Sequence, residues 1–172
     1  VASALGANKA LRVKARDVLR LDDVPSFDKA FPCRRGWLTI PIVGKRASVV
    51  TELAVGLRKA HGVLPDARKV TAAGLIDDLC KAADERDHDG VLIVIDEMGK
   101  FIEASALGLG DDVSFFQELA EIGSRARGKI VVIGILYQSF AQYATRLGMD
   151  TRDDWAKVQG RYSDIPLVAA SD

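Results

Sequence analysis

The chain has 172 residues, of which 48% are hydrophobic and 28% charged, and only 5 are proline. This composition excludes wholesale disorder and collagen-like or low-complexity sequence, and the length suits one domain with a substantial core. Lys plus Arg and Asp plus Glu both number 24, so the formal net charge is zero and indicates neither a nucleic acid nor an anionic membrane as partner.

We expect the first 36 residues to form a helical and irregular segment that leads into the α/β core. Residues 1–20 are rich in Ala, Leu, Lys and Arg, which favour one or two helical pieces. Residues 21–36 are dense in Asp, Pro, Ser and Gly, so an irregular connection is expected there. A strand should follow over 37–43, where β-forming residues dominate and Pro41 favours an edge position or a distorted end.

Two amphipathic helices are predicted next. Apolar residues recur at helical spacing from Val50 to Ala60, and Ser48 is placed to act as the N-cap. A second stripe of this kind lies within residues 71–86. It leads into residues 91–95, which are all aliphatic and mostly β-branched, as expected of a strand that is covered on both faces.

The second half of the chain repeats this alternation. Residues 104–110 predict a small glycine-containing loop, after which Asp111 or Asp112 caps a helix with a long apolar stripe. Residues 129–136 repeat the fully apolar strand pattern. From Ser139 the pattern becomes helical again.

The order of these elements predicts an α/β fold. Strands that alternate with helices build a mostly parallel sheet with helices on both faces, which is a three-layer sandwich. A short last strand over 165–169 would add to it, although Pro166 disfavours a central position. Without an internal repeat or a flexible linker, we expect a single domain, with residues 1–36 as the lead-in and 37–172 as the α/β core.

Two carboxylates follow the aliphatic strand at 91–95 directly. Ligands bind at the carboxyl ends of strands in open parallel sheets. A run of aliphatic residues followed by Asp-Glu is the Walker B pattern, in which Asp96 would hold Mg²⁺ and Glu97 would orient or deprotonate the attacking water. The same residues could instead begin an ordinary solvated turn after a buried strand.

The next strand also ends in polar residues. Gln138 is the first choice, and Ser139 the second, for a sensor that touches the γ-phosphate or the lytic water. The structural alternative is that Ser139 caps the following helix and Gln138 is a loop side chain.

Residues 91–172, about half the chain, resemble the Walker B and sensor half of an additional-strand P-loop ATPase related to AAA+ and STAND enzymes. More narrowly, VLIVIDEMGKFIE, FFQELAEIGSRARGKIVVIGILYQSFAQYA and DDWAKVQGRYSDIPL resemble large bacterial ATPases of phage-defence systems. The resemblance implies ATP and Mg²⁺ as cofactors, Asp96 as the metal ligand, Glu97 and Gln138 as catalytic residues, and Ser139 as a nucleotide contact. It also implies that Gly99-Lys100-Phe101 continue the loop after Walker B.

The resemblance further makes Arg161 a candidate arginine finger or second sensor. A permanently charged, planar guanidinium suits that work because it can neutralise charge that develops on a phosphate. Arg125 and Arg127 compete for the role. Each of these arginines could equally be a surface residue at a helix end, where positive charge is favoured.

The chain lacks one part of such an enzyme, the phosphate cradle G-x-x-x-x-G-K-[ST]. The nearest imitation, residues 44–48 (GKRAS), reads as an ordinary turn between a strand and a helix. Because the chain begins with Val1 rather than Met, we expect the cradle upstream, in the rest of the same polypeptide. An associated domain or a second copy of the protein would complete the site, and the 172-residue piece alone should bind nucleotide poorly.

Two other functions stay open on the sequence alone. The first is a non-catalytic scaffold or interaction domain of P-loop-like architecture. The second is a phosphorylatable receiver-like domain, which would need an acidic pair after its first strand, and no convincing strand precedes Asp22-Asp23. The apolar runs are too short to span a bilayer, and Cys33 and Cys80 form no C-x-x-C pair, so a cytoplasmic protein without a membrane partner is expected.

Overall fold

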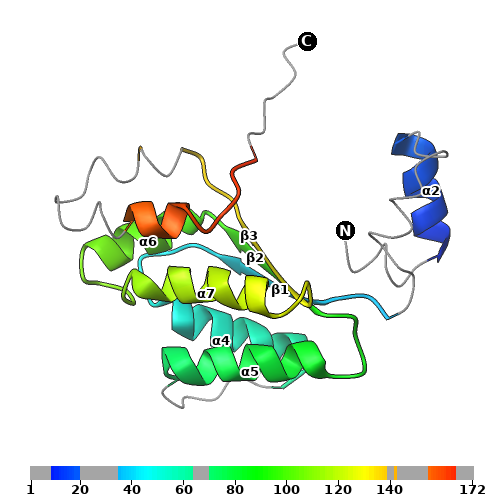
Figure 1. The fold of residues 1–172 in the computed structure, drawn as a ribbon, viewed down its shortest axis with the longest axis horizontal. Helices are drawn as coiled ribbons and strands as arrows, with labels where there is room; N and C mark the ends of the chain where they lie inside the picture. Colours follow the sequence, from blue (N-terminus) through cyan, green and yellow to red (C-terminus); the bar gives the residue numbers. More distant parts are fainter. Residues whose placement is uncertain (1–8, 20–34, 64–69, 139–141, 143–154, 166–172) are drawn as a thin grey trace, which may run out of the picture.

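The computed structural model describes residues 9–19, 35–63, 70–138, 142 and 155–165 (Figure 1). Its elements are α2 (Lys9–Leu19), β1 (Leu38–Val43), α4 (Val49–Ala60), α5 (Ala72–Asp84), β2 (Val91–Asp96), α6 (Met98–Ala106), α7 (Ser114–Arg125) and β3 (Ile130–Gly134). Residues 155–159 are helical as well. No helix of this part of the chain is long and apolar enough to cross a membrane.

The three strands form one parallel sheet in the order β1-β2-β3. Ile93 of β2 is in register with Ile40 of β1 and with Val132 of β3. The strand that ends in Asp96 is therefore the central one. This arrangement confirms the α/β fold and the parallel sheet that the alternation of elements predicted.

Three helices cover one face of the sheet. Helix α4 packs on β1, α7 packs on β3, and α5 contacts α4, α7 and β2. In Figure 1 all three helices lie on the same side of the sheet. The packing of α4 is close, because a Cβ at Gly56 would lie 2.8 Å from Cγ2 of Ile40. Ile40, Ile93 and Ile95 are completely buried between these layers.

The other face of the sheet is more open. Val131 and Ile133 of β3 point to it, since they alternate with Ile130 and Val132, and they expose 37% and 45% of their surface. The strand order explains why α4, α5 and α7 share one face. Each connection moves one strand further in the same direction, and right-handed connections then all return over the same face. A third layer requires a strand placed after a reversal of direction, so the three-layer sandwich stays a prediction.

Helix α6 was not predicted, and the expectation of a loop through Gly99-Lys100-Phe101 was wrong. Met98, Phe101 and Ile102 have the spacing of one helical face, and all three are buried. Burial of this face stabilises the helix despite Gly99 in its first turn. The loop predicted for 104–110 begins only at Leu107, where α6 has ended.

The two aspartates predicted as alternative caps of the next helix do different things. Asp112 accepts a hydrogen bond from the N–H of Ser114 at 2.7 Å, and bonding to Ser114 lowers the pKa of Asp112. Asp111 binds the start of α4 instead, where it accepts hydrogen bonds from Ser48 Oγ at 2.9 Å and from the N–H of Val50 at 3.0 Å. The predicted cap of α4 is confirmed, because Ser48 Oγ accepts the N–H of Thr51 at 3.0 Å.

The remaining expectations fall at the ends of the described segments. Strand β3 ends at Gly134, earlier than the predicted range 129–136. The helix predicted from Ser139 lies mostly outside the described residues, as do most of the irregular connection at 21–36 and of the last strand predicted at 165–169.

Candidate functional site

Asp96 is the last residue of the central strand, and its contacts tie it to the end of β1. Its carbonyl oxygen accepts a hydrogen bond from the N–H of Gly44 at 2.7 Å, just beyond the end of β1. Its carboxylate oxygen Oδ1 accepts the N–H of Glu97 at 2.8 Å. Within the described residues, the second oxygen, Oδ2, has no hydrogen-bond or ion-pair partner. One carboxylate oxygen at the end of the central strand is thus available to an incoming cation.

Glu97 has a left-handed backbone, with φ at 50° and ψ at 37°. This conformation costs a non-glycine residue about 1–2 kcal/mol, so it persists only where the surroundings enforce it. Here the neighbouring strands enforce it from both sides. The N–H of Met98 donates to the carbonyl oxygen of Ile135, which follows β3, at 3.0 Å, and the N–H of Gly44 fixes the preceding carbonyl group, that of Asp96.

The close approach of Gly44 is part of this restraint. A Cβ at position 44 would lie only 2.0 Å from the carbonyl oxygen of Glu97, so only glycine fits the backbone as it stands. The turn after β1 and the turn after β2 therefore pack backbone against backbone. The direction in which the Glu97 side chain leaves the sheet is set by the fold rather than by the local sequence.

The carboxylate of Glu97 forms an ion pair with Lys100. The Lys100 Nζ lies 2.5 Å from Glu97 Oε2, and the Glu97 side chain is 26% exposed. The hydrogen bond to Glu97 raises the pKa of Lys100, as do electrostatic interactions with Glu97, Tyr137 and Asp96, while partial desolvation opposes the shift. Tyr137 comes from the segment after β3. Lys100 thus lies within electrostatic reach of groups from both β2 and β3.

Gln138, the predicted sensor, lies on the same edge of the sheet as the two acids. The end of β3 is joined to β2 there, because the N–H of Ile135 donates to the carbonyl oxygen of Ile95 at 2.9 Å. The Gln138 side chain is exposed, and in the described residues no hydrogen bond joins it to Asp96 or Glu97. Ser139, the second choice, lies outside the residues that the structure describes.

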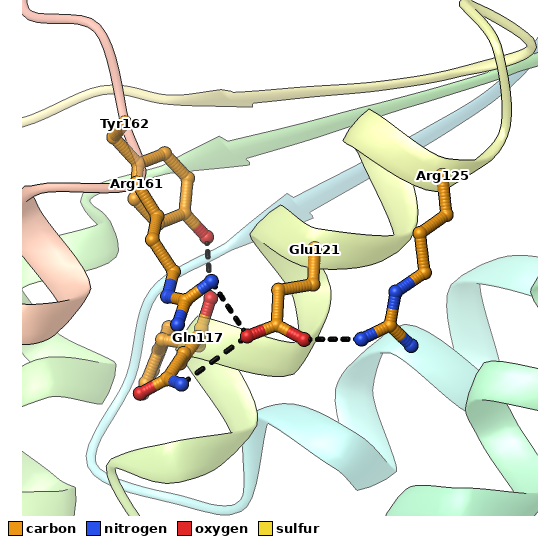
Figure 2. A network of polar contacts seen from close by, with 6 residues as sticks. Gln117, Glu121, Arg125, Arg161 and Tyr162 are labelled. Atoms are coloured by element: carbon orange, nitrogen blue, oxygen red, sulfur yellow. Dashed lines mark hydrogen bonds and ion pairs between the residues drawn. The ribbon is translucent and has the colours of Figure 1, made fainter.

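Arg161, the predicted finger, contacts α7. Its Nη1 lies 2.7 Å from Oε1 of Glu121, whose Oε2 lies 2.7 Å from Nη2 of Arg125 (Figure 2). Gln117 also donates to Glu121, at 3.2 Å. Figure 2 shows Arg161 reaching α7 from the C-terminal segment, with Glu121 between the two arginines. The structure therefore brings Arg161 and Arg125 together at Glu121.

The third candidate arginine, Arg127, lies in the turn that follows α7. Its φ of 52° is left-handed and its side chain is exposed. Together with the contacts of Arg161 and Arg125, this places the three candidate arginines on or beside α7, whereas the two acids lie at the end of β2.

The turn at residues 44–48 behaves as a structural connection. The N–H groups of Val50 and Thr51, at the start of α4, are bound by Asp111 and Ser48. Lys45 forms an ion pair with Glu52 at 2.8 Å. Lys45 and these N–H groups at the start of α4 are already engaged within the chain, so they are not open to a phosphate as the corresponding groups of a cradle would be.

Two contributors to the site were not predicted as such. Lys100 was expected in a loop without a role, although its i, i+3 spacing from Glu97 was visible in the sequence. The constraint at Gly44 had no sequence signal, because it arises from the packing of two turns that are 53 residues apart (97 minus 44).

Asp96 is the residue at this edge of the sheet that could bind a metal ion. In the described segments, no three His, Cys, Asp or Glu side chains are grouped so that they could hold a metal ion by themselves. Magnesium bound with a nucleotide needs fewer protein ligands, because phosphates and waters supply the others.

Comparisons with protein-family models, curated proteins and solved structures found no match to the chain.

Proposed function

We propose that the chain is the Walker B and sensor half of a P-loop-type ATPase that hydrolyses ATP with Mg²⁺. The observation that supports this proposal most is the turn at Asp96 and Glu97 after β2, which hydrogen bonds fix in place. Asp96 ends the central, buried strand of a parallel sheet, and Glu97 follows it directly. The N–H of Gly44, beyond β1, donates to the carbonyl oxygen of Asp96, and the N–H of Met98 donates to the carbonyl oxygen of Ile135, beyond β3. A metal-bound phosphate is a ligand that such a rigid acidic edge suits.

The strand order is compatible with the same proposal. In open α/β sheets, the ligand binds beside the point where the direction of strand succession reverses. The succession β1-β2-β3 contains no reversal, so a reversal beyond β3 would bring the next strand beside the segment that holds Gln138. We propose that the strand beside β3 leads into the phosphate cradle and comes from the rest of the same polypeptide, upstream of Val1. A helix following that strand would cover the open face at Val131 and Ile133 and so complete three layers.

Each acid has a separate task in this proposal. Asp96 would hold Mg²⁺ through Oδ2 or through the waters of the ion. When bound, Mg²⁺ would neutralise negative charge that develops on the phosphates. Glu97 would orient the lytic water and accept its proton, and Gln138 would hold that water or the terminal phosphate from the β3 side.

Arg161 belongs to the proposal as a finger toward a second copy of the protein. In the described structure its guanidinium is held by Glu121. Assembly would have to present it to the neighbouring site, where a planar cation can stabilise charge on the terminal phosphate. Homo-oligomer formation is therefore part of the proposal for Arg161, and the roles of Asp96 and Glu97 do not depend on it.

One observation favours a second candidate function, a non-catalytic scaffold of the same architecture. The 172 residues contain no phosphate cradle, and Lys45 of the turn at 44–48 and the N–H groups of Val50 and Thr51 at the start of α4 are engaged within the chain. A scaffold keeps the fold and needs neither nucleotide nor turnover. The similarity to phage-defence ATPases belongs to the first candidate and would give its ATPase a role in antiviral defence.

The deciding experiment uses the complete protein of the reading frame. A G-x-x-x-x-G-K-[ST] motif upstream of Val1 and ATP turnover by the purified protein are the expected results. Glu97→Gln should then retain ATP binding and lower turnover by at least about a hundredfold, since general base catalysis contributes about 10²–10⁴-fold. Glu103→Gln, which removes a carboxylate of α6 outside the proposed site, is the matched control and should retain turnover. Full turnover by Glu97→Gln, or no nucleotide binding, would contradict the proposal.

A further inference from the structure

We infer that Lys100 is a positioning residue that is shared between Glu97 and the terminal phosphate of ATP. While the phosphate site is empty, Lys100 holds the Glu97 carboxylate in the ion pair that the structure shows. When ATP binds, Lys100 moves to the terminal phosphate and leaves Glu97 free to act on water. This inference rests on the function proposed above and adds to it a device that makes the site respond to the third phosphate.

The geometry leaves the side chains as the moving parts. The backbone of Glu97 is held through Gly44, Met98 and Ile135. A change in the site must therefore come from the Glu97 carboxylate or from its partner. The Lys100 side chain is 51% exposed, against 26% for Glu97, so Lys100 is the freer of the two.

The place of Lys100 in its helix also favours a partner of opposite charge. Lys100 lies in the first turn of α6, where the helix dipole disfavours a cation and favours an anion. A nearby negative charge offsets this effect, and in the described structure that charge is Glu97 at 2.5 Å. A terminal phosphate carries more negative charge than a carboxylate and would compete for the same ammonium group.

Lys100 lies at the edge of the sheet where the proposed nucleotide would bind. Its partner Glu97 directly follows Asp96, the last residue of the central strand, and the next residue, Met98, is hydrogen-bonded to the segment after β3. An ordinary surface pair contrasts with this arrangement. Lys81 and Asp78 have the same i, i+3 spacing on α5 at 3.4 Å, and both are well exposed.

Two measurements on the complete protein test the inference. The first is the ratio of the Kd for ADP to the Kd for ATP, in the presence of Mg²⁺. Lys100→Met should lower this ratio on the order of tenfold, the size of one charge-assisted hydrogen bond, and leave the Kd for ADP unchanged. Lys100→Arg should preserve most of the preference, and Lys81→Met, the matched surface variant, should preserve all of it.

The second measurement follows the lysine side chain itself by NMR of ¹³Cε-labelled protein, with the Lys100 signal assigned from its loss in Lys100→Met. ATP should shift the signal and ADP should not. Glu97→Gln should shift it already in the nucleotide-free protein. Thermal unfolding of each variant checks that the substitution leaves the fold intact.

The outcomes separate the inference from the proposed function. If ATP binds and is hydrolysed but the Lys100 signal stays in place and Lys100→Met keeps the wild-type ratio, the shared-lysine inference is wrong and the ATPase stands. If the complete protein binds no nucleotide, or Glu97→Gln turns over normally, the proposed function fails and the inference fails with it.

Discussion

Gly44 and Glu97 lie in backbone contact, so close that a Cβ on Gly44 would be 2.0 Å from the carbonyl oxygen of Glu97. The contact joins the turn after β1 to the turn after β2, next to the hydrogen bond of 2.7 Å from the Gly44 N–H to the Asp96 carbonyl. The left-handed backbone of Glu97 is formed at this junction. The stability of the domain and the orientation of the acid are therefore coupled at one point.

Gly44→Ala should show this coupling. The added methyl group meets backbone that cannot move aside cheaply, so we expect a loss of about 2 kcal/mol or more in the free energy of unfolding, measured with urea. ATP turnover of the complete protein should fall as well, because Glu97 is displaced. Gly123→Ala is the control, because its nearest neighbour, the carbonyl oxygen of Ile130, is at an ordinary 3.5 Å. Equal stability of both variants would show that position 44 tolerates a side chain.

The Lys100 ion pair predicts a pH dependence. Glu97 raises the pKa of Lys100 above the ordinary lysine value of 10.5. A group whose pKa is raised on folding stabilises the folded state below its unfolded pKa, and this contribution disappears as the pH rises through the folded value. On raising the pH, the pair should therefore persist through neutral pH and be lost at alkaline pH, above the ordinary lysine range.

An NMR titration of the Lys100 side chain checks this prediction. In Glu97→Gln, the Lys100 pKa should fall relative to the wild type, because the main cause of the upward shift has been removed. A Lys100 pKa that is the same in both proteins would mean that the ion pair does not form in solution.

Tyr162 anchors the C-terminal segment to α7, and its removal predicts a change in stability. The Tyr162 hydroxyl donates to the carbonyl oxygen of Phe116 at 3.0 Å, and burial raises the pKa of Tyr162. Tyr162→Phe should cost about 1 kcal/mol of unfolding free energy, the usual value of one buried hydrogen bond. Chemical denaturation at neutral pH measures it, and an unchanged midpoint would show that the segment does not depend on this bond.

Arg161 has two testable roles that differ in size. Its first role is structural, because it forms a partly exposed ion pair with Glu121. Arg161→Ala should therefore change the free energy of unfolding by less than about 1 kcal/mol. As a finger in an assembled protein, its loss should reduce turnover by about a thousandfold, at the low end of the range for arginine fingers. Arg125→Ala also removes a partner of Glu121 and should leave turnover intact. Undiminished turnover in Arg161→Ala would show that Arg161 has only the structural role, the ion pair with Glu121.

Sequence patterns predicted those parts of the fold that local chemistry determines. The β-branched run at 91–95 predicts a strand and is part of β2. The apolar stripe from Val50 to Ala60 predicts a helix and is part of α4. Helix α6 was missed because Gly99 and the resemblance to a Walker B loop pointed away from helix, whereas the burial of Phe101 and Ile102 decided the outcome.

The candidate site was predictable only in part, for a similar reason. The position of Asp96 at the end of a strand follows from the sequence, because the aliphatic run ends there. The left-handed backbone of Glu97 and the cap that Asp111 provides to α4 do not follow from it. Both depend on contacts between segments far apart in the sequence, which local sequence patterns do not encode.

The central claim is that Asp96 and Glu97 face a metal-bound triphosphate. Addition of Mn²⁺ with ATP to the ¹⁵N-labelled complete protein tests it most directly, because a paramagnetic ion broadens the amide signals of residues close to it. The account predicts that the signals of Gly44, Asp96 and Glu97 broaden first, that Asp96→Asn abolishes the effect, and that the signal of His88, which precedes β2 at the opposite end of the strand, stays sharp. Broadening centred elsewhere, or broadening that survives Asp96→Asn, would contradict the account.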